Sequence, residues 1–427
     1  MKTNILIFPA GETNSIELHD ALSHNVNINV FGASSIDRHG PYVFKNYRGG
    51  LPFINAKNFI QEFNKLLFEW KIDFVFPTHD SVALFLAEKQ KDINAKIMAA
   101  DFQTALICRD KKETYKLFYD CDFCPKQFDS FIEFPVFIKP REGQGAIGTR
   151  LIETIDNVPD DIHLDDYIIS EYLPGEELTV DCLTDSKGKL CACLPRIRHR
   201  VMAGVSVAGE TIEVSEEVLS IGRKINSRLN FLGLWYFQLK KDINDKYKLL
   251  EISTRCAGTM CLSRARGINL PLLSIYVSLG YQLNIFENPY NITMDRALIS
   301  RYKINYEYDT VYIDYDDTVV EKDKVCIPVI RYIYQCKNQN KKMILITRHE
   351  EDHNDSIEDS MKKHHIDISI FDEIIKLSFK QKKSSVINPN RAIFIDNAYA
   401  ERKDIHDQFN IPVFDVEGIE VLLDWRE

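Results

Sequence analysis

Residues 1–95 alternate short apolar runs with segments of helical periodicity. Three of the runs predict β-strands, at residues 5–8, 28–31 and 74–76. Between the second and third runs, five apolar side chains fall on one helical face: Phe59, Phe63, Leu66, Leu67 and Trp70. This alternation predicts a parallel sheet covered by helices. The polar segments 11–14 and 77–80 follow strand ends, where open α/β sheets place ligands, although polar loops are common there in any case.

A glycine pattern follows an apolar run that ends in a lysine. Gly143, Gly145 and Gly148 have the G-x-G-x-x-G spacing that both dinucleotide-binding folds and phosphate-covering hairpins use. A dinucleotide site would run straight into a helix, whereas residues 149–153 alternate polar and apolar like a second strand. We therefore expect a glycine-rich β-hairpin whose N–H groups face phosphate, with Lys139 adding positive charge. A flexible surface hairpin is the alternative.

Polar residues in three other segments of the chain are also candidates for binding a ligand. Asp110 is placed as the N-cap of a helix, and a lysine in the first turn opposes the helix dipole, a cost that a bound phosphate would offset. A solvated basic turn explains this segment equally well. The segment at 168–173 reads as an apolar strand that leads into hydrogen-bond acceptors and a Pro-Gly turn. Such a segment could form a hinge that hydrogen-bonds the edge of an adenine and a ribose. Alternation places Arg196, Arg198 and Arg200 on one face of an extended segment, toward an anion or water.

Two later apolar runs predict a pair of neighbouring strands, at residues 234–240 and 247–255. This pairing places Gln238 near Glu251, and period two puts Ser253 and Arg255 on the face of Glu251. Oxygen atoms of this kind hold Mg²⁺, and an arginine beside them can steady a transferring phosphoryl group. A structural salt-bridge cluster is the alternative.

Taken in order, these motifs resemble those of ATP-grasp enzymes. Residues 1 to about 300 look most like the ATP-grasp half of the large subunit of carbamoyl-phosphate synthase and its relatives, the carboxylate–amine ligases. The resemblance implies an α/β and α+β multidomain protein, with a parallel α/β pre-ATP-grasp domain at 1–95 and an ATP-grasp domain at 96–305. It implies ATP and Mg²⁺ as cofactors, and small-molecule carboxylate and amine substrates.

The resemblance also assigns roles to single residues. It implies that the glycine hairpin closes over ATP phosphates held by Lys111 and Lys139, while Glu171 and Leu173 lie along the adenine hinge and Glu177 holds the ribose. Mg²⁺ would be ligated by Gln238, Glu251 and Ser253, and Arg255 would meet the phosphoryl group under transfer. Ser253 stands where the family's Glu-x-Asn-x-Arg motif has asparagine, a better ligand, so a second Mg²⁺ is in question. Arg196 and Arg198 are candidates for gripping the substrate carboxylate or acyl phosphate.

A new pattern begins at Tyr308, where an apolar strand ends in Asp314 and Asp316. Two carboxylates at the end of a buried strand are costly, because like charges repel and lose hydration. A second strand ends in Thr347, a third in Asp396, and a lysine-rich segment lies between them. Carboxylates in such positions usually bind a metal or take part in catalysis.

These motifs resemble those of the haloacid dehalogenase superfamily and cover residues 306–427. The resemblance implies a Rossmann-like phosphatase domain acting on a phosphorylated small molecule. Asp314 would be the nucleophile, Asp316 the general acid and base, and Thr347 and Lys383 the phosphate-binding groups, with Lys380 and Lys376 as other choices for the lysine. Asp314 and Asp396 would hold Mg²⁺, with Asp316 beside them as a further candidate ligand.

Composition limits the remaining functions. A net charge of −10 without a long basic run argues against nucleic acid as a partner, and no apolar run reaches the length of a membrane span. We therefore expect a cytoplasmic protein with its ten cysteines reduced. The pairs Cys121-x-x-Cys124 and His349-x-x-x-His353 suggest metal sites, but the first lacks a second pair and the second lies in a polar run with no apolar helix to bury it. Homo-oligomerisation is left open.

The sequence thus predicts a carboxylate–amine ligase fused to a phosphatase, with both sites serving one pathway. Two alternatives keep the fold. The first unit could be a small-molecule kinase, or it could be a nucleotide sensor that regulates the phosphatase.

Overall fold

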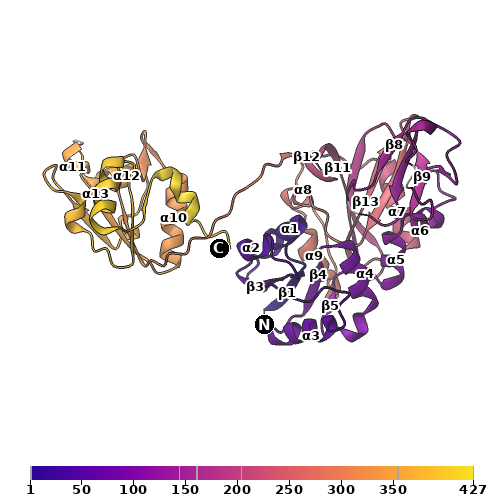
Figure 1. The fold of residues 1–427 in the computed structure, drawn as a ribbon, viewed down its shortest axis with the longest axis horizontal. Helices are drawn as coiled ribbons and strands as arrows, with labels where there is room; N and C mark the ends of the chain where they lie inside the picture. Colours follow the sequence, from indigo (N-terminus) through magenta and orange to yellow (C-terminus); the bar gives the residue numbers. More distant parts are fainter. Residues whose placement is uncertain (1, 144, 160–161, 203, 353–354, 427) are drawn as a thin grey trace. The chain divides into compact units, whose positions relative to one another are not determined.

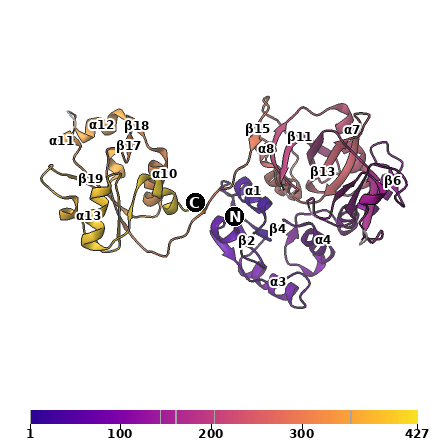
Figure 2. The ribbon, with the colours of Figure 1, turned by 45° about the horizontal axis from the view of Figure 1, so that its top comes forward.

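The computed structural model describes residues 2–143, 145–159, 162–202, 204–352 and 355–426, so that Gln144 of the glycine hairpin and His353 lie outside the described residues. The chain divides into two compact units, Met1–Leu298 and Ile299–Glu427, which Figures 1 and 2 show. Each unit is built around its own parallel sheet and its own buried apolar clusters.

The first unit begins with a five-stranded parallel sheet in the order β3-β2-β1-β4-β5. Its strands are β1 (Thr3–Phe8), β2 (Ile28–Ala33), β3 (Asn46–Arg48), β4 (Phe74–Pro77) and β5 (Lys96–Ile97). Its helices are α1 (Thr13–Leu22), α2 (Gly40–Val43), α3 (Phe59–Glu69), α4 (Asp80–Glu88) and the 3-10 turn η1 (Gln90–Asp92). The three predicted strands and the predicted helix are confirmed. The strands β3 and β5 were not predicted, because so few residues carry no periodicity.

Alternation along β1 explains why both faces of this sheet are covered. Ile5 and Ile7 share one buried cluster with Leu18 and Leu22 of α1, whereas Leu6 and Phe8 share another with Phe59 and Phe63 of α3. Successive side chains of a strand point to opposite faces, so a central strand of apolar residues needs a helix on each side.

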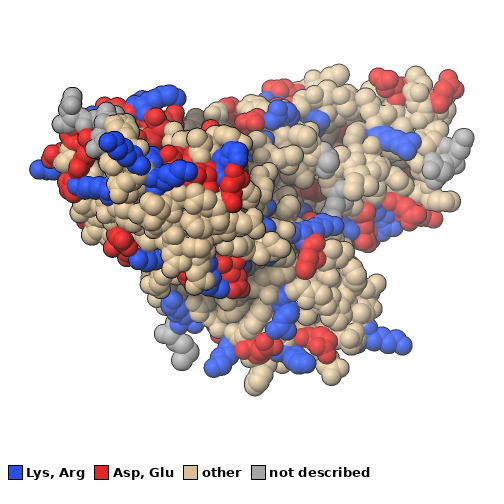
Figure 3. Space-filling model, turned by 60° about the vertical axis from the view of Figure 1, so that its left-hand side comes forward, with Lys and Arg blue, Asp and Glu red and all other residues tan. Residues whose placement is uncertain are grey.

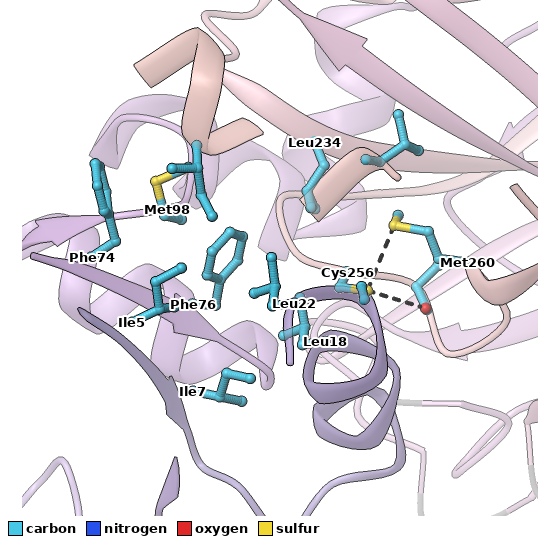
Figure 4. Close-up of a cluster of buried hydrophobic side chains, with 14 of the residues drawn as sticks. Ile5, Ile7, Leu18, Leu22, Phe74, Phe76, Met98, Leu234, Cys256 and Met260 are labelled. Carbon is cyan, nitrogen blue, oxygen red and sulfur yellow. Dashed lines mark hydrogen bonds between the residues drawn. The ribbon is translucent and has the colours of Figure 1, made fainter. Parts of the chain in front are cut away.

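One buried cluster joins the first sheet to the later part of the unit. Figure 4 shows Ile5, Phe74 and Phe76 in the same buried cluster as Leu234, Cys256 and Met260. The Cys256 thiol lies 3.6 Å from the Met260 sulfur atom. Residues far apart in the chain therefore share one core, which fixes the loops that follow β1 and β4 against the segment after residue 253.

The rest of the first unit consists of two antiparallel sheets. The smaller has the order β6-β9-β7-β8, with β6 (Gln127–Phe128), β7 (Val136–Pro140), β8 (Arg150–Ile152) and β9 (Tyr167–Glu171). The larger has the order β14-β13-β10-β11-β12-β15, with β10 (Glu177–Thr184), β11 (Leu190–Met202), β12 (Val205–Thr211), β13 (Gly233–Lys241), β14 (Tyr247–Ser253) and β15 (Thr293–Asp295). The helices are α5 (Phe102–Arg109), α6 (Lys111–Leu117), α7 (Glu216–Arg228), α8 (Cys261–Ala265), α9 (Leu270–Ser278) and the turn η2 (Ile155–Asn157).

The second unit is a five-stranded parallel sheet in the order β20-β19-β16-β21-β22, with a small hairpin. The strands are β16 (Thr310–Ile313), β19 (Lys342–Thr347), β20 (Glu373–Lys376), β21 (Ala392–Ile395) and β22 (Val413–Phe414), and the hairpin is β17 (Val320–Glu321) with β18 (Lys324–Val325). The helices are α10 (Ile327–Asn338), α11 (His349–Asp352), α12 (Ile357–Lys363) and α13 (Tyr399–Phe409), with turns η3 (Ile368–Ile370), η4 (Lys383–Val386) and η5 (Val416–Leu422). Separate apolar clusters on the two faces of the sheet show that helices cover both.

Two observations bear on whether the protein meets nucleic acid or a membrane. On the face in Figure 3, the described Lys and Arg side chains are interspersed with Asp and Glu, without the extended basic area that binds a nucleic-acid backbone. Among the described residues, no helix is long and apolar enough to cross a membrane.

Candidate active sites

The glycine segment of the first unit is a β-hairpin, as predicted. Strands β7 and β8 pair antiparallel, with Phe137 opposite Leu151. Gly145 and Gly148 adopt φ of 59° and 75°, a left-handed conformation that glycine reaches without the strain of a side chain. A Cβ atom on Gly148 would also lie 2.8 Å from Cγ of Pro140.

The hairpin lies over a cavity of about 480 Å³. Most predicted nucleotide-site residues line it: Lys111, Lys139, Gly143, Gly145, Glu171, Leu173, Glu177, Arg196, Arg198, Gln238, Glu251 and Arg255. The lining also includes Glu12, Thr13, Asn14 and Thr78, from the two strand-end segments that the sequence marked as candidate ligand segments. The described lining of the cavity does not include Gly148 or Ser253.

Lys139 is buried, and its charge is poorly compensated. Its ammonium group donates to the Tyr115 hydroxyl and lies 3.3 Å from the carbonyl oxygen of Leu250. Burial and the nearby Lys111 charge lower the pKa of Lys139 to about 7. Tyr115 is fully buried in α6. The sequence gives no signal for its contact with Lys139, because that contact depends on tertiary packing.

Lys111 begins α6, where the Asp110 side chain accepts from the backbone N–H of Lys112, so the predicted N-cap is confirmed. The Lys111 ammonium group lies 3.9 Å from Glu251 Oε2. Glu251 stands directly opposite Gln238 across β13 and β14, as the strand pairing predicted. Directly opposite residues have Cβ atoms about 5 Å apart, so a carboxylate and an amide oxygen face the cavity together.

Ser253 and Arg255 both contact Asp80, which the sequence analysis included in the polar segment 77–80 without giving it a role of its own. The Ser253 hydroxyl donates to Asp80 Oδ1 at 2.7 Å, and Arg255 donates to Oδ2 at 2.8 Å. Burial opposes ionisation of Asp80, but Arg255 and Ser253 outweigh it and lower the pKa of Asp80 to about 2. Asp80 begins α4, three residues after the end of β4. That strand-end position is the signal by which the sequence marked its segment.

The three arginines of β11 have separate carboxylate partners. Buried Arg196 pairs with buried Asp181, and its Nε also donates to the Thr259 hydroxyl at 2.8 Å. Arg198 pairs with Glu177 and donates to the Gly204 carbonyl at 2.9 Å. A break in the strand register follows Arg198. Arg200 therefore leaves the predicted common face and pairs with exposed Asp295 at 2.8 Å.

The hinge segment and Glu177 also make contacts within the protein. Glu171 Oε1 accepts from the backbone N–H of Lys126 at 2.7 Å, so this side chain fixes the end of β9. Glu177 Oε2 lies 3.7 Å from the Lys240 ammonium group. The roles of Glu171, Leu173 and Glu177 in binding adenine and ribose stay predictions.

In the second unit, three strand ends bring the predicted motif residues together. The Lys383 ammonium group lies 2.6 Å from Asp314 Oδ1 and 2.7 Å from Asp396 Oδ2. Thr347, the last residue of β19, is buried. Of the lysines considered, Lys383 is therefore the one beside the carboxylates, whereas Lys376 pairs with Glu350 at 2.6 Å.

His349 departs from the sequence prediction. It was expected in an unburied polar run, but the residue is 4% exposed, so that expectation is wrong. Its Nδ1 atom lies 2.7 Å from Asp316 Oδ1. The reason is local: His349 begins α11 two residues after β19, and its backbone N–H donates to the Thr347 hydroxyl at 3.0 Å.

The carboxylates of the second unit are suited to a cation. Burial raises the pKa values of Asp314 and Asp396. The negative charge of Asp396 raises the pKa of Asp314 further. Burial opposes the charge of Lys383, yet the two carboxylates outweigh it and raise its pKa. Lys383 supplies one positive charge for two carboxylates, so the donor set retains negative charge that a divalent cation would balance. Among the described residues, no group of three His, Cys, Asp or Glu side chains is arranged to hold a metal ion alone.

Comparisons with known proteins agree with this fold. Residues 163–297 match a family model described as ATP-grasp in the biosynthetic pathway with Ter operon. An N5-carboxyaminoimidazole ribonucleotide synthetase from Thermotoga maritima is 15% identical, with a TM-score of 0.55 over 72% of this chain and 83% of that chain. An L-amino acid ligase from Bacillus licheniformis is 14% identical, with a TM-score of 0.52 over 65% and 74%.

A pyruvate carboxylase from Rhizobium etli is also similar, at 14% identity and a TM-score of 0.54. The match covers 66% of this chain but spans only 29% of that longer chain. None of the curated proteins compared with the chain matches it significantly. The protein therefore contains an ATP-grasp domain within a mixed α/β fold. At these identities the solved structures establish similarity of fold alone.

Proposed function

We propose that the first unit is an ATP-dependent carboxylate–amine ligase that acts through an acyl phosphate. The observation that carries this proposal is the convergence of Lys111, Lys139 and Glu251 on one cavity beneath a glycine hairpin. An ATP-grasp domain supplies the nucleotide-binding context. The names of two similar structures, a synthetase and an amino acid ligase, favour ligase chemistry over other uses of ATP.

Different residues of the cavity would have different roles in the reaction. Lys111 and Lys139 bind the phosphate chain, and the hairpin excludes water from the intermediate. Gln238 and Glu251 would hold Mg²⁺, which supplies positive charge to the phosphates. We leave Ser253 out of the proposed ligands, because its hydroxyl donates to Asp80.

The proposed chemistry has two steps. A carboxylate oxygen of the substrate attacks the γ-phosphorus of ATP, and the bond to the bridging oxygen of ADP breaks. The amine nitrogen then attacks the acyl carbon, phosphate leaves, and the amide nitrogen loses its proton to solvent. Arg255, held by Asp80, would steady the phosphoryl group, and Arg196 or Arg198 would grip the acid; all three line the cavity.

ADP release over pooled carboxylic acids and amines tests the proposal. The assay uses Asp314→Asn protein, so that the second unit consumes no phosphorylated species. We expect release that needs both an acid and an amine, that is lost in Lys139→Met, and that persists in Lys116→Met, since Lys116 is an exposed residue of the same helix as Lys111. A phosphorylated acid as the stable product would indicate a kinase, and ATP binding without turnover would indicate a sensor. Either result would contradict the ligase proposal.

We further propose that the second unit is a Mg²⁺-dependent phosphatase of the haloacid dehalogenase type. The observation that favours it is the position of Lys383 between Asp314 and Asp396 at two strand ends. Asp314 would be the nucleophile, while Thr347 and Lys383 would bind the phosphate and Asp314 and Asp396 a magnesium ion. Release of phosphate from p-nitrophenyl phosphate in MgCl₂ tests this. We expect activity in Lys139→Met protein, where the first site is disabled, and none in Asp314→Asn.

A further inference from the structure

His349 is a buried titratable group of the second unit to which the proposed phosphatase chemistry assigns no role. Its ring is fixed on several sides. Nδ1 lies 2.7 Å from Asp316 Oδ1, Nε2 lies 3.4 Å from Asp355 Oδ1, and the Tyr315 ring packs edge-on at 5.4 Å between ring centroids. The side chain therefore has one orientation, and that orientation directs Nδ1 at Asp316.

The partner carboxylate, Asp316, differs from its neighbours in position. Asp314 and Asp396 are held by Lys383, whereas Asp316 lies in the turn after β16, and its side chain is 28% exposed. Hydrogen bonds fix the backbone of that turn, including Val319 N–H to the Tyr315 carbonyl at 2.8 Å and Asp317 N–H to the Val320 carbonyl at 2.7 Å. These hydrogen bonds hold the backbone and do not involve the Asp316 carboxyl group. The contact of His349 Nδ1 with Asp316 Oδ1 acts on the side chain itself.

We propose that His349 is a positioning residue that holds Asp316 in the orientation needed for general acid and base catalysis. The inference rests on the proposed phosphatase function. In the first step, a carboxylate oxygen of Asp314 attacks phosphorus, the bond to the leaving oxygen breaks, and Asp316 gives that oxygen its proton. In the second step, Asp316 takes a proton from water as the water oxygen attacks phosphorus, and the bond to Asp314 breaks. Both transfers need the same Asp316 oxygen within hydrogen-bond reach of the substrate.

His353, the second histidine of the His-Glu-x-x-His spacing, lies outside the described residues. Nδ1 of His349 is turned toward Asp316. A purely structural role for the ring is the alternative. The test must therefore depend on proton transfer rather than on folding.

The leaving group supplies such a test. A p-nitrophenolate leaves without much help, whereas an alkoxide must be protonated, so a misplaced Asp316 harms alkyl phosphates most. We expect His349→Leu to lower kcat about 10-fold on p-nitrophenyl phosphate and about 100-fold or more on glycerol phosphate, with KM little changed. The ratio of the two rates does not depend on how much of the protein folds.

Two variants complete the experiment. In His349→Asn the amide nitrogen is attached at the same carbon as Nδ1, so this variant should recover most of the lost rate on glycerol phosphate. His406→Asn alters an exposed histidine of α13 and should match the wild type. An equal loss on both substrates, or no recovery in His349→Asn, would overturn the inference while leaving the phosphatase in place. If the wild type hydrolyses neither substrate in an Asp314-dependent way, the phosphatase proposal itself fails, and the inference with it.

Discussion

Binding of ATP should be coupled to proton uptake by Lys139. Burial and the Lys111 charge lower the pKa of Lys139 to about 7 in the free protein, from 10.5 for an ordinary lysine. A bound triphosphate places several negative charges beside the ammonium group and favours its protonated form. The pKa of Lys139 is therefore higher in the complex than in the free protein, and nucleotide binding takes up a proton wherever the pH lies between the two values.

The magnitude follows from the two states. At pH 8, one unit above the free pKa, about nine in ten molecules hold neutral Lys139 and must acquire a proton to bind tightly. Each unit of pH above 7 costs about 1.4 kcal/mol, or about tenfold in affinity, until the pKa of the complex is reached. Below pH 7 the lysine is already charged, so this part of the affinity is fully present and changes little.

Isothermal titration calorimetry in buffers of different ionisation enthalpy measures the proton count directly. At pH 8 we expect the wild type to take up about 0.9 proton more than Lys139→Arg, because arginine stays charged and does not titrate. The difference between the two proteins cancels the protons that come from the nucleotide and its magnesium. Equal uptake in both proteins, or a wild-type affinity that stays constant between pH 7 and 9, would refute the assignment of Lys139 to the phosphates.

Other changes test separate parts of the first unit. Gly148→Ala should raise the dissociation constant for ATP about tenfold in a titration, because a side chain at φ 75° strains the hairpin by about 1–2 kcal/mol. Asp181→Asn should lower the free energy of unfolding in urea by about 3–5 kcal/mol, because it leaves the buried Arg196 charge unpaired. Asp80→Asn should remove about 2 kcal/mol of stability at pH 7, since the folded pKa of Asp80 is lowered to about 2 by Arg255. That loss should shrink as the pH falls from about 4 to 2, where the wild type also loses this ionic contribution, and urea unfolding at pH 7 and pH 3 would show it.

The sequence predicts those parts of the sites that depend on local regularity. Period two along two adjacent strands placed Gln238 opposite Glu251, and strand ends placed Asp314 and Asp396 together, because a strand's pattern fixes both its faces and its end. Tyr115 and His349 could not be found in this way. Their partners come from other elements, and only the packing of those elements decides which polar atom a buried side chain meets.

The charges of the first cavity explain why Lys139 is the group to perturb. Arg255 pairs with Asp80, Arg196 with Asp181, Arg198 with Glu177, and Lys111 approaches Glu251. Such pairs hold cations in place before any ligand arrives, but each carboxylate also cancels attraction for a nucleotide. Lys139 instead contacts two neutral oxygens, those of the Tyr115 hydroxyl and the Leu250 carbonyl. Its pKa is lowered because burial and the Lys111 charge disfavour the ammonium form. We therefore expect replacement of any of the paired arginines to affect stability and substrate geometry more than the affinity for the nucleotide phosphates.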